Sequence, residues 1–185
     1  MSLPASFEGR ERARLFCALR LAEGVLDSLS EWQAEHIRGG RSVSRDHLHI
    51  TLAFLGHRPI EELAVICEET RAAAAAAESI RLKITRYRET PRVGMLVLED
   101  ATTVAHSTAL AYELQARMEA IGIPARERRP WRAHVTVVRF TKPLRLKPSL
   151  PDLGEVVPSD AAVFLSRLRP SGAEYFVVES FALGG

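Results

Sequence analysis

Two short segments carry the residue types that acid–base chemistry needs, and both have the same pattern. The first runs from His49 to Leu52 (His-Ile-Thr-Leu) and the second from His134 to Val137 (His-Val-Thr-Val). Each lies in an apolar run typical of a β-strand, so its His and Thr point to one face and the apolar residues point into the core. Two histidines with a hydroxyl beside each are the minimum set for acid–base chemistry on a phosphate without a metal.

Composition argues against a chance repeat. With six His and nine Thr in 185 residues, a copy with apolar second and fourth positions is expected roughly 0.06 times. A single copy would be interpreted as a hydrogen-bonded strand histidine followed by a good β-former. Two copies favour a shared site, with His49, Thr51, His134 and Thr136 as its candidate catalytic residues.

His47 is an alternative to His49, because it lies two residues earlier on the same strand face. It has no counterpart in the second copy, where Arg132 stands at the corresponding position. Neither copy has the helical two-ligand spacing of zinc hydrolases, and no Cys or acidic residue stands at matching spacing. We therefore predict no metal and no other cofactor.

Length and composition indicate one globular domain spanning residues 1–185. Hydrophobic residues make up 46% and charged residues 26% of the chain, which is ordinary for a globular fold. No apolar run is long enough to cross a bilayer, and charged residues occupy the place where a signal peptide needs its apolar segment. Two distant cysteines, Cys17 and Cys67, indicate neither a disulfide framework nor a metal site. We expect a cytoplasmic protein with a flexible N-terminus over residues 1–11.

Positive charge is concentrated around the second copy. Between Arg126 and Lys147 stand eight basic residues and one acid, Glu127, a net charge of +7 in a chain whose net charge is +2. An anionic ligand would be drawn to this segment.

Alternating and helical patterns predict the elements that position the two histidines. Strands are expected at Arg12–Leu21, His47–Leu55, Ile80–Arg88, Val93–Glu99, Trp131–Phe140, Ala161–Arg169 and Glu174–Phe181. Helices are expected at Glu23–Ile37, from Pro59 into the alanine run at Ala72–Ala77, and from a Thr102 or Thr103 cap to Gly122. Residues 141–159 have no clear period, and Gly56 is expected to end the first motif strand.

This order of elements predicts an α+β protein of two related halves, each placing one motif strand beside a shared cleft. In the first strand, Leu15, Cys17 and Leu19 are expected on one face, with Phe16 and Ala18 on the other. The last two strands are expected to form a hairpin through Pro170–Ala173.

Four segments resemble the RNA 2′,3′-cyclic phosphodiesterases, also called 2′-5′ RNA ligases, of the two-histidine phosphoesterase superfamily. They are Arg14–Leu19, His47–Gly56, Trp131–Arg139 and the closing stretch from Leu165 to Phe181. The resemblance implies a bilobal fold, with two pseudo-symmetric lobes of antiparallel sheet and helices around a central cleft.

The resemblance also implies residue roles. His49 is expected to donate a proton to the leaving O3′, and His134 to activate water, which leaves a 2′-phosphomonoester. Thr51 and Thr136 are expected to hydrogen-bond the non-bridging phosphate oxygens. From the residues alone, either imidazole suits either role, because its ordinary pKa is about 6.5.

Two further residues are implied to bind the nucleotide. An aromatic at the position of Phe16 stacks on the terminal base, although a plain core aromatic is an equal interpretation of this residue. An arginine at the position of Arg139 contacts the nucleotide. Strict alternation places Arg139 on the face opposite His134, so this contact requires that the strand end or bulge there.

The expected function is metal-independent hydrolysis of RNA 2′,3′-cyclic phosphate ends by a monomer that does not bind membranes. Three alternatives stay open. They are 2′-5′ RNA ligation in the same site, hydrolysis of a small cyclic nucleotide or ADP-ribose cyclic phosphate, and a non-catalytic RNA-binding module that predicts salt-sensitive binding without turnover.

Overall fold

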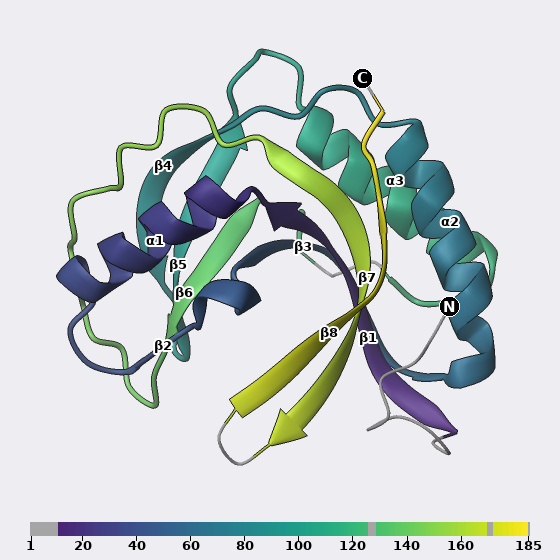
Figure 1. Ribbon diagram of the computed structural model, residues 1–185, viewed down its shortest axis with the longest axis horizontal. Helices are drawn as coiled ribbons and strands as arrows, with labels where there is room; N and C mark the ends of the chain where they lie inside the picture. The colour runs from purple at the N-terminus through teal and green to yellow at the C-terminus, as the bar shows by residue number, and fades with distance from the viewer. Residues whose placement is uncertain (1–10, 126–128, 170–171, 185) are drawn as a thin grey trace.

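A computed structural model describes residues 11–125, 129–169 and 172–184 of the chain. Within them, eight strands form one curled antiparallel sheet in the order β4-β5-β6-β3-β1-β7-β8, with β2 paired to β6 (Figure 1). The strands are β1 (Arg12–Leu21), β2 (Arg41–Ser42), β3 (His49–Pro59), β4 (Leu82–Glu89), β5 (Val93–Asp100), β6 (His134–Arg139), β7 (Pro158–Arg169) and β8 (Gly172–Phe181). The helices are α1 (Glu23–His36), α2 (Leu63–Ala75) and α3 (His106–Ala120).

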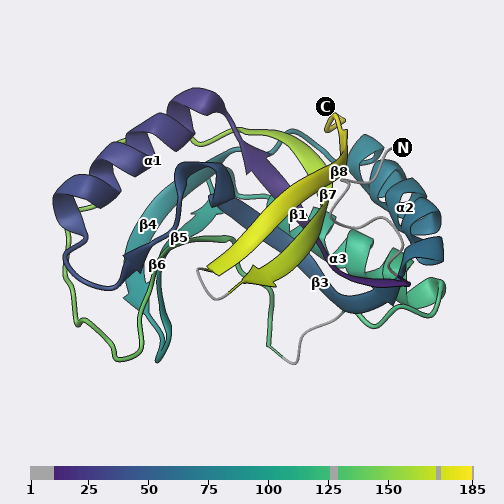
Figure 2. The same cartoon turned by 60° about the horizontal axis from the view of Figure 1, so that its bottom comes forward.

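The sheet has two halves that meet between the two motif strands. Strands β3 and β6 pair at Ile50 and Val135, the apolar residues inside the two motif copies. Helix α1 lies over the half that contains β4, β5 and β6, whereas α2 and α3 lie against the half that contains β3, β1 and β7 (Figures 1 and 2). The predicted α+β architecture of two interleaved halves is confirmed.

Strand β1 is buried on both of its faces. Leu15, Cys17 and Leu19 belong to the main core, while Phe16 and Ala18 belong to a second apolar cluster on the opposite face. This alternation is the predicted one. Burying each large apolar side chain contributes about 1.5–3 kcal/mol to stability, so both faces of β1 help to hold it in the middle of the sheet.

The first motif strand differs from its predicted bounds at both ends. It begins at His49, because residues 45–47 form a 3-10 turn, and it runs past Gly56 to Pro59. Gly56 has a φ of 74° and pairs with Leu15 next to a register shift. The glycine therefore bends the strand at a bulge instead of ending it. A second 3-10 turn at residues 60–62 separates Pro59 from α2.

The helix before the second motif strand also begins differently. Helix α3 starts at His106 without a threonine cap. Instead, the Asp100 carboxylate accepts hydrogen bonds from Ser107 N at 2.9 Å and Ser107 Oγ at 2.7 Å. An acidic group near the first turn satisfies an otherwise unpaired N–H and favours the positive end of the helix dipole.

Most remaining elements agree with the predictions. The second motif strand is shorter than expected, and strand β2 was not expected at all. Three predicted features fall wholly or partly outside the described residues: the N-terminus up to residue 10, residues 126–128 of the basic segment, and residues 170–171 of the hairpin turn. No helix in the described ranges is both long and apolar enough to cross a membrane.

Candidate active site

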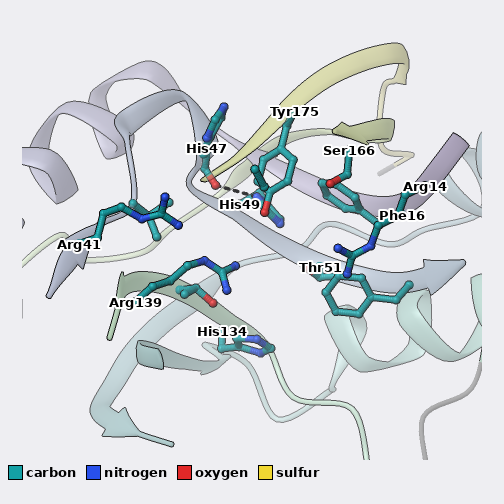
Figure 3. A pocket seen from close by; sticks show the side chains of 14 residues that line it. Arg14, Phe16, Arg41, His47, His49, Thr51, His134, Arg139, Ser166 and Tyr175 are labelled. Atoms are coloured by element: carbon teal, nitrogen blue, oxygen red, sulfur yellow. Dashed lines mark hydrogen bonds between the residues drawn. The ribbon is translucent and has the colours of Figure 1, made fainter. Parts of the chain in front are cut away.

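A cavity of about 510 Å³ lies where the two halves of the sheet meet (Figure 3). Its walls include all six residues singled out from the sequence: Phe16, His49, Thr51, His134, Thr136 and Arg139. The two histidines enter it from β3 and β6, on opposite sides of the cavity. The fold thus brings together residues that are as much as 123 positions apart in the chain, from Phe16 to Arg139.

Both motif strands bulge at the same motif position. The register between β3 and β1 passes over Leu52, and the register between β6 and β5 passes over Val137. Each of these is the residue that follows the motif threonine, and each is buried. The extra residue shifts the alternation of side chains by one position. As a result, the third residue after each threonine, Phe54 or Arg139, faces the cavity.

The bulge in β6 explains how Arg139 reaches the site. Strict alternation would place its side chain on the face opposite His134, and the sequence-based prediction therefore required an irregular strand. The register shift lies between Thr136 and Val138, and Arg139 lines the cavity. In the register of β2 and β6, Arg139 stands opposite Arg41. Arg41 is a second arginine in the cavity wall.

Buried glutamines from two helices hold the two bulges. Gln33 of α1 donates through Nε2 to the Val137 carbonyl at 2.6 Å and to Val43 O at 3.0 Å. Gln115 of α3 donates through Nε2 to the Leu52 carbonyl at 2.9 Å. Each glutamine is only 3% exposed. A buried amide needs such partners, so each bond ties a bulged carbonyl to a helix on the far side of the strand.

The two histidines are oriented by the same kind of backbone contact. Nδ1 of His49 lies 2.8 Å from the His47 carbonyl, and Nδ1 of His134 lies 2.9 Å from the Arg132 carbonyl. A carbonyl oxygen only accepts, so Nδ1 carries the proton in each ring and donates it. The neutral rings therefore keep Nε2 free to take a proton, and the protonated rings offer Nε2–H as a donor.

The surroundings of His49 are aromatic. Its ring centroid lies 5.0 Å from that of Phe16, 5.8 Å from Phe164 and 5.4 Å from Tyr175. The pKa of His49 is lowered to about 4, mainly by burial and also by the nearby basic groups His134, His47 and Arg139, while the hydrogen bond to the His47 carbonyl acts in the opposite direction. Desolvation disfavours the charged imidazolium, so His49 is neutral at pH 7.

Phe16 is part of this aromatic wall and is almost fully buried. Its ring stacks on Phe164 with centroids 4.8 Å apart and an interplanar angle of 3°, and the edge of Tyr175 approaches it at 5.1 Å. Only 3% of Phe16 is exposed. Phe16 therefore packs as a core aromatic and also lines the cavity, while its stacking on a base stays a prediction. Tyr175 is the more accessible ring in the same wall.

Sequence reasoning missed several residues of the cavity. Arg14 lies two positions before Phe16 and shares its face, so the alternation of β1 was a usable signal. Ser166 and Tyr175 pair with each other across β7 and β8, a neighbour relation that no local pattern carries. His47, the alternative to His49, lines the cavity beside Tyr175 at 4.7 Å, and it orients His49 through its backbone carbonyl.

The charge of the cavity suits a phosphate. Arg14, Arg41 and Arg139 lie in its wall, and no Asp or Glu is found among its described lining residues. The positive electrostatic potential of such a cluster raises the local concentration of anions. In the described part of the chain, no three His, Cys, Asp or Glu side chains gather as a metal ion would require.

Known proteins match this chain over most of its length. A family model described as LigT-like phosphoesterase matches residues 19–91. An RNA 2′,3′-cyclic phosphodiesterase of Thermus thermophilus is 35% identical over 182 residues, which covers 93% of this chain and 91% of the relative. A crystal structure of a protein from Thermus thermophilus has a TM-score of 0.78 at 33% identity, covering 93% of this chain and 98% of that one.

The fold is shared more widely. The structure of Escherichia coli LigT complexed with 3′-AMP has a TM-score of 0.79 at 22% identity, covering 95% of this chain and all of that one. The identity to the Thermus relative extends over nearly the whole length of both chains, and the cavity joins the two repeated motifs on which the resemblance rests. The chain belongs to the RNA 2′,3′-cyclic phosphodiesterase family of two-histidine phosphoesterases.

Proposed function

We propose that this chain hydrolyses 2′,3′-cyclic phosphate ends of RNA to 2′-phosphomonoesters without a metal. The observation that carries the proposal is the delivery of two His-x-Thr pairs, from two separate strands, into one arginine-lined cavity. The Thermus relative is named an RNA 2′,3′-cyclic phosphodiesterase, which supports the proposed substrate. In-line displacement at phosphorus needs a base on the side of the attacking water and an acid on the side of the leaving oxygen.

The proposed reaction assigns the base to His134 and the acid to His49, as in the family. Nε2 of His134 takes a proton from water while the water oxygen bonds to phosphorus. The bond from phosphorus to O3′ breaks, and Nε2–H of His49 gives its proton to O3′. One water is consumed, and the two imidazoles exchange protonation states, which solvent then restores. Thr51 and Thr136 donate hydrogen bonds to the non-bridging oxygens, where negative charge accumulates.

The substrate itself prepares His49 for this role. Before substrate binds, the low pKa leaves its ring neutral at pH 7, whereas a general acid must hold a proton. The anionic phosphodiester brings a negative charge next to the ring and favours the imidazolium. His49 is therefore protonated together with substrate binding. Arg139 contributes to holding the same anion.

We also propose where the terminal nucleoside lies. Its base packs against the aromatic wall formed by Phe16, Phe164 and Tyr175, with Tyr175 as the accessible ring, and Arg139 contacts the nucleotide. Stacking on one aromatic ring is worth about 1–3 kcal/mol and tolerates every base. This preference suits an enzyme that recognises the chemistry of an RNA end more than its sequence.

Two broader features complete the proposal. The enzyme acts as a monomer, because one chain supplies both motif strands and the cavity between them. It works in the cytoplasm, and its two buried cysteines, Cys17 and Cys67, which are not in disulfides in the described structure, suit a reducing compartment.

The test is hydrolysis of an oligonucleotide that ends in a 2′,3′-cyclic phosphate, with EDTA present. We expect a 2′-phosphate product, assigned by ³¹P NMR, and a loss of about 10²–10⁴-fold in kcat for His49→Gln and for His134→Gln. His57→Gln, which alters an exposed histidine outside the cavity, is the matched control and keeps full activity.

Other outcomes point to the alternatives. Full activity in either active-site variant contradicts the proposal, and a 3′-phosphate product reverses its regiochemistry. Turnover of mononucleotide or ADP-ribose cyclic phosphates, without turnover of oligonucleotides, favours a small-molecule phosphodiesterase. Salt-sensitive RNA binding with no turnover favours a binding module.

A further inference from the structure

A second cavity adjoins the active site on the side of His134. Its volume is about 250 Å³, and it shares Thr51, Phe54 and His134 with the first cavity. Its other walls come from β4, β5 and the segment of residues 129–132 that leads into β6. A ligand bound at the reactive phosphate therefore has a continuous path into this second space.

The second cavity is positively charged. Arg88, Arg129 and Arg132 line it, and its described lining residues include no Asp or Glu. None of these three arginines pairs with a carboxylate in the part of the chain that the structure describes. The arginines around the helices behave differently: Arg45 and Arg117, for example, each pair with acidic side chains. Arginines without acidic partners in a concave surface are suited to phosphate groups.

The second cavity also offers aromatic surface. Phe54 lies at the boundary of the two cavities with 48% of its surface exposed, and the bulge at Leu52 places it there. Trp131 also lines the cavity, and its Nε1 donates to the Thr51 carbonyl at 2.9 Å, which fixes the indole beside a motif residue. An exposed ring beside arginines that lack acidic partners is the combination that binds single-stranded nucleic acid.

We propose that this cavity is a subsite for a second nucleotide of single-stranded RNA, with Phe54 as its stacking platform and Arg88, Arg129 and Arg132 as its phosphate contacts. The inference deepens the proposed function and rests on it, because the first nucleotide is the one that carries the cyclic phosphate. The second nucleotide has two sources with the same chemistry: the preceding nucleotide of the same strand, or the 5′-hydroxyl end of another strand.

The first arm of the test measures substrate length. Uridine 2′,3′-cyclic phosphate and a uridine trinucleotide with the same cyclic end are compared by kcat/KM, for the wild type, Phe54→Leu and the double variant Arg88→Ala/Arg129→Ala. We expect the wild type to prefer the trinucleotide by about tenfold or more, and both variants to reduce this ratio severalfold. Arg81→Ala removes an exposed arginine remote from both cavities and leaves the ratio unchanged.

The second arm supplies a separate 5′-hydroxyl trinucleotide together with uridine 2′,3′-cyclic phosphate and measures 2′-5′ linked product. If the other strand is the occupant, the wild type forms this product and the same variants lose it, while the length ratio stays constant. If neither the length ratio nor the joined product changes in the variants, the subsite is disproved. Failure of the wild type to hydrolyse any cyclic phosphate instead contradicts the proposed function and is seen before any variant is compared.

Discussion

The two motif strands share one construction but stand in different surroundings. In β3 and β6 alike, a His and a Thr face the cavity, the next residue is bulged, and a helix glutamine holds the bulged carbonyl. His49, however, is packed among three aromatic rings, whereas His134 contacts none of the rings in the described residues. Identical local structure can therefore place two imidazoles in different surroundings, and those of His49 lower its pKa through burial.

The residue that faces the cavity beyond each bulge also differs between the two strands. The β3 bulge turns the apolar ring of Phe54 into the cavity, and the β6 bulge turns the guanidinium of Arg139 into it. The same kind of bulge thus brings an aromatic ring to the cavity from β3 and a positive charge from β6. Substitutions at matching positions of β3 and β6 distinguish the parts of the two strands that are equivalent from the parts that are not.

Apart from the two histidines, the largest expected effect concerns Thr51 and Thr136, which have equivalent positions in the two strands. Thr51→Val and Thr136→Val each remove one hydrogen-bond donor to the phosphate while keeping side-chain shape. We expect each to lower kcat by about 10²–10³-fold, because these donors act where charge develops in the transition state. Steady-state kinetics on the cyclic-phosphate oligonucleotide measures this.

Thr85→Val on β4, which lies outside the cavity, is the control and keeps the wild-type kcat. If one threonine variant is fully active while the other is inactive, the equivalence of the two strands in catalysis is wrong.

A smaller effect is expected for the glutamines, which act as positioning residues. Gln33→Leu releases the Val137 carbonyl behind Arg139, so we expect KM to rise by about tenfold while kcat changes little. Gln115→Leu releases the Leu52 carbonyl behind Phe54, and it should weaken the preference for longer substrates instead. Each variant should also lose about 1–3 kcal/mol of stability, because a buried carbonyl loses its partner.

The separation between KM and substrate-length effects is what makes this test specific. A purely structural role for the glutamines predicts lower thermal stability in both variants with unchanged KM and unchanged length preference. The kinetic constants are therefore measured well below the unfolding temperature of each variant.

Local patterns were sufficient to predict the motif strands and their inward-facing residues. Alternation with a period of two placed Phe16 and Cys17 on opposite faces of β1, and the apolar residues of both motifs in the core. The paired histidines were predictable for the same reason: each needs only its own strand to face the cavity. The order of elements was then enough to indicate two halves around a cleft.

The bulges were beyond local patterns, because a bulge is defined by the register of a neighbouring strand. For Arg139 the sequence could state the condition, a bulge or strand end, but could not place it after Thr136. Gln33 and Gln115 resemble ordinary polar residues of amphipathic helices, and only tertiary packing shows that they are buried. Strand β2 has two residues, too few to produce any alternating pattern.

The smallest expected effect tests the difference between the two histidines directly. If the aromatic surroundings set the low pKa of His49, then Phe16→Leu should raise that pKa from about 4 toward its ordinary value of 6.5, because a smaller side chain admits water to the ring. Imidazole NMR titration, assigned with the His49→Gln variant, measures the shift. Phe54→Leu is the control, since Phe54 contacts Phe16 but has no described ring contact with His49.

The free energy of unfolding should depend on pH through the protonation of His49. A lowered pKa means that the unfolded chain binds more protons than the folded one between pH 6.5 and 4. The contribution of neutral His49 is therefore complete above pH 6.5 and is lost as the pH falls through 4. Phe16→Leu brings the folded pKa closer to the unfolded value, so denaturant unfolding at pH 7 and pH 4.5 should differ less in the variant than in the wild type. An unchanged pKa in Phe16→Leu would remove the aromatic wall as the cause of the low His49 pKa and leave the nearby basic groups His134, His47 and Arg139 as its source.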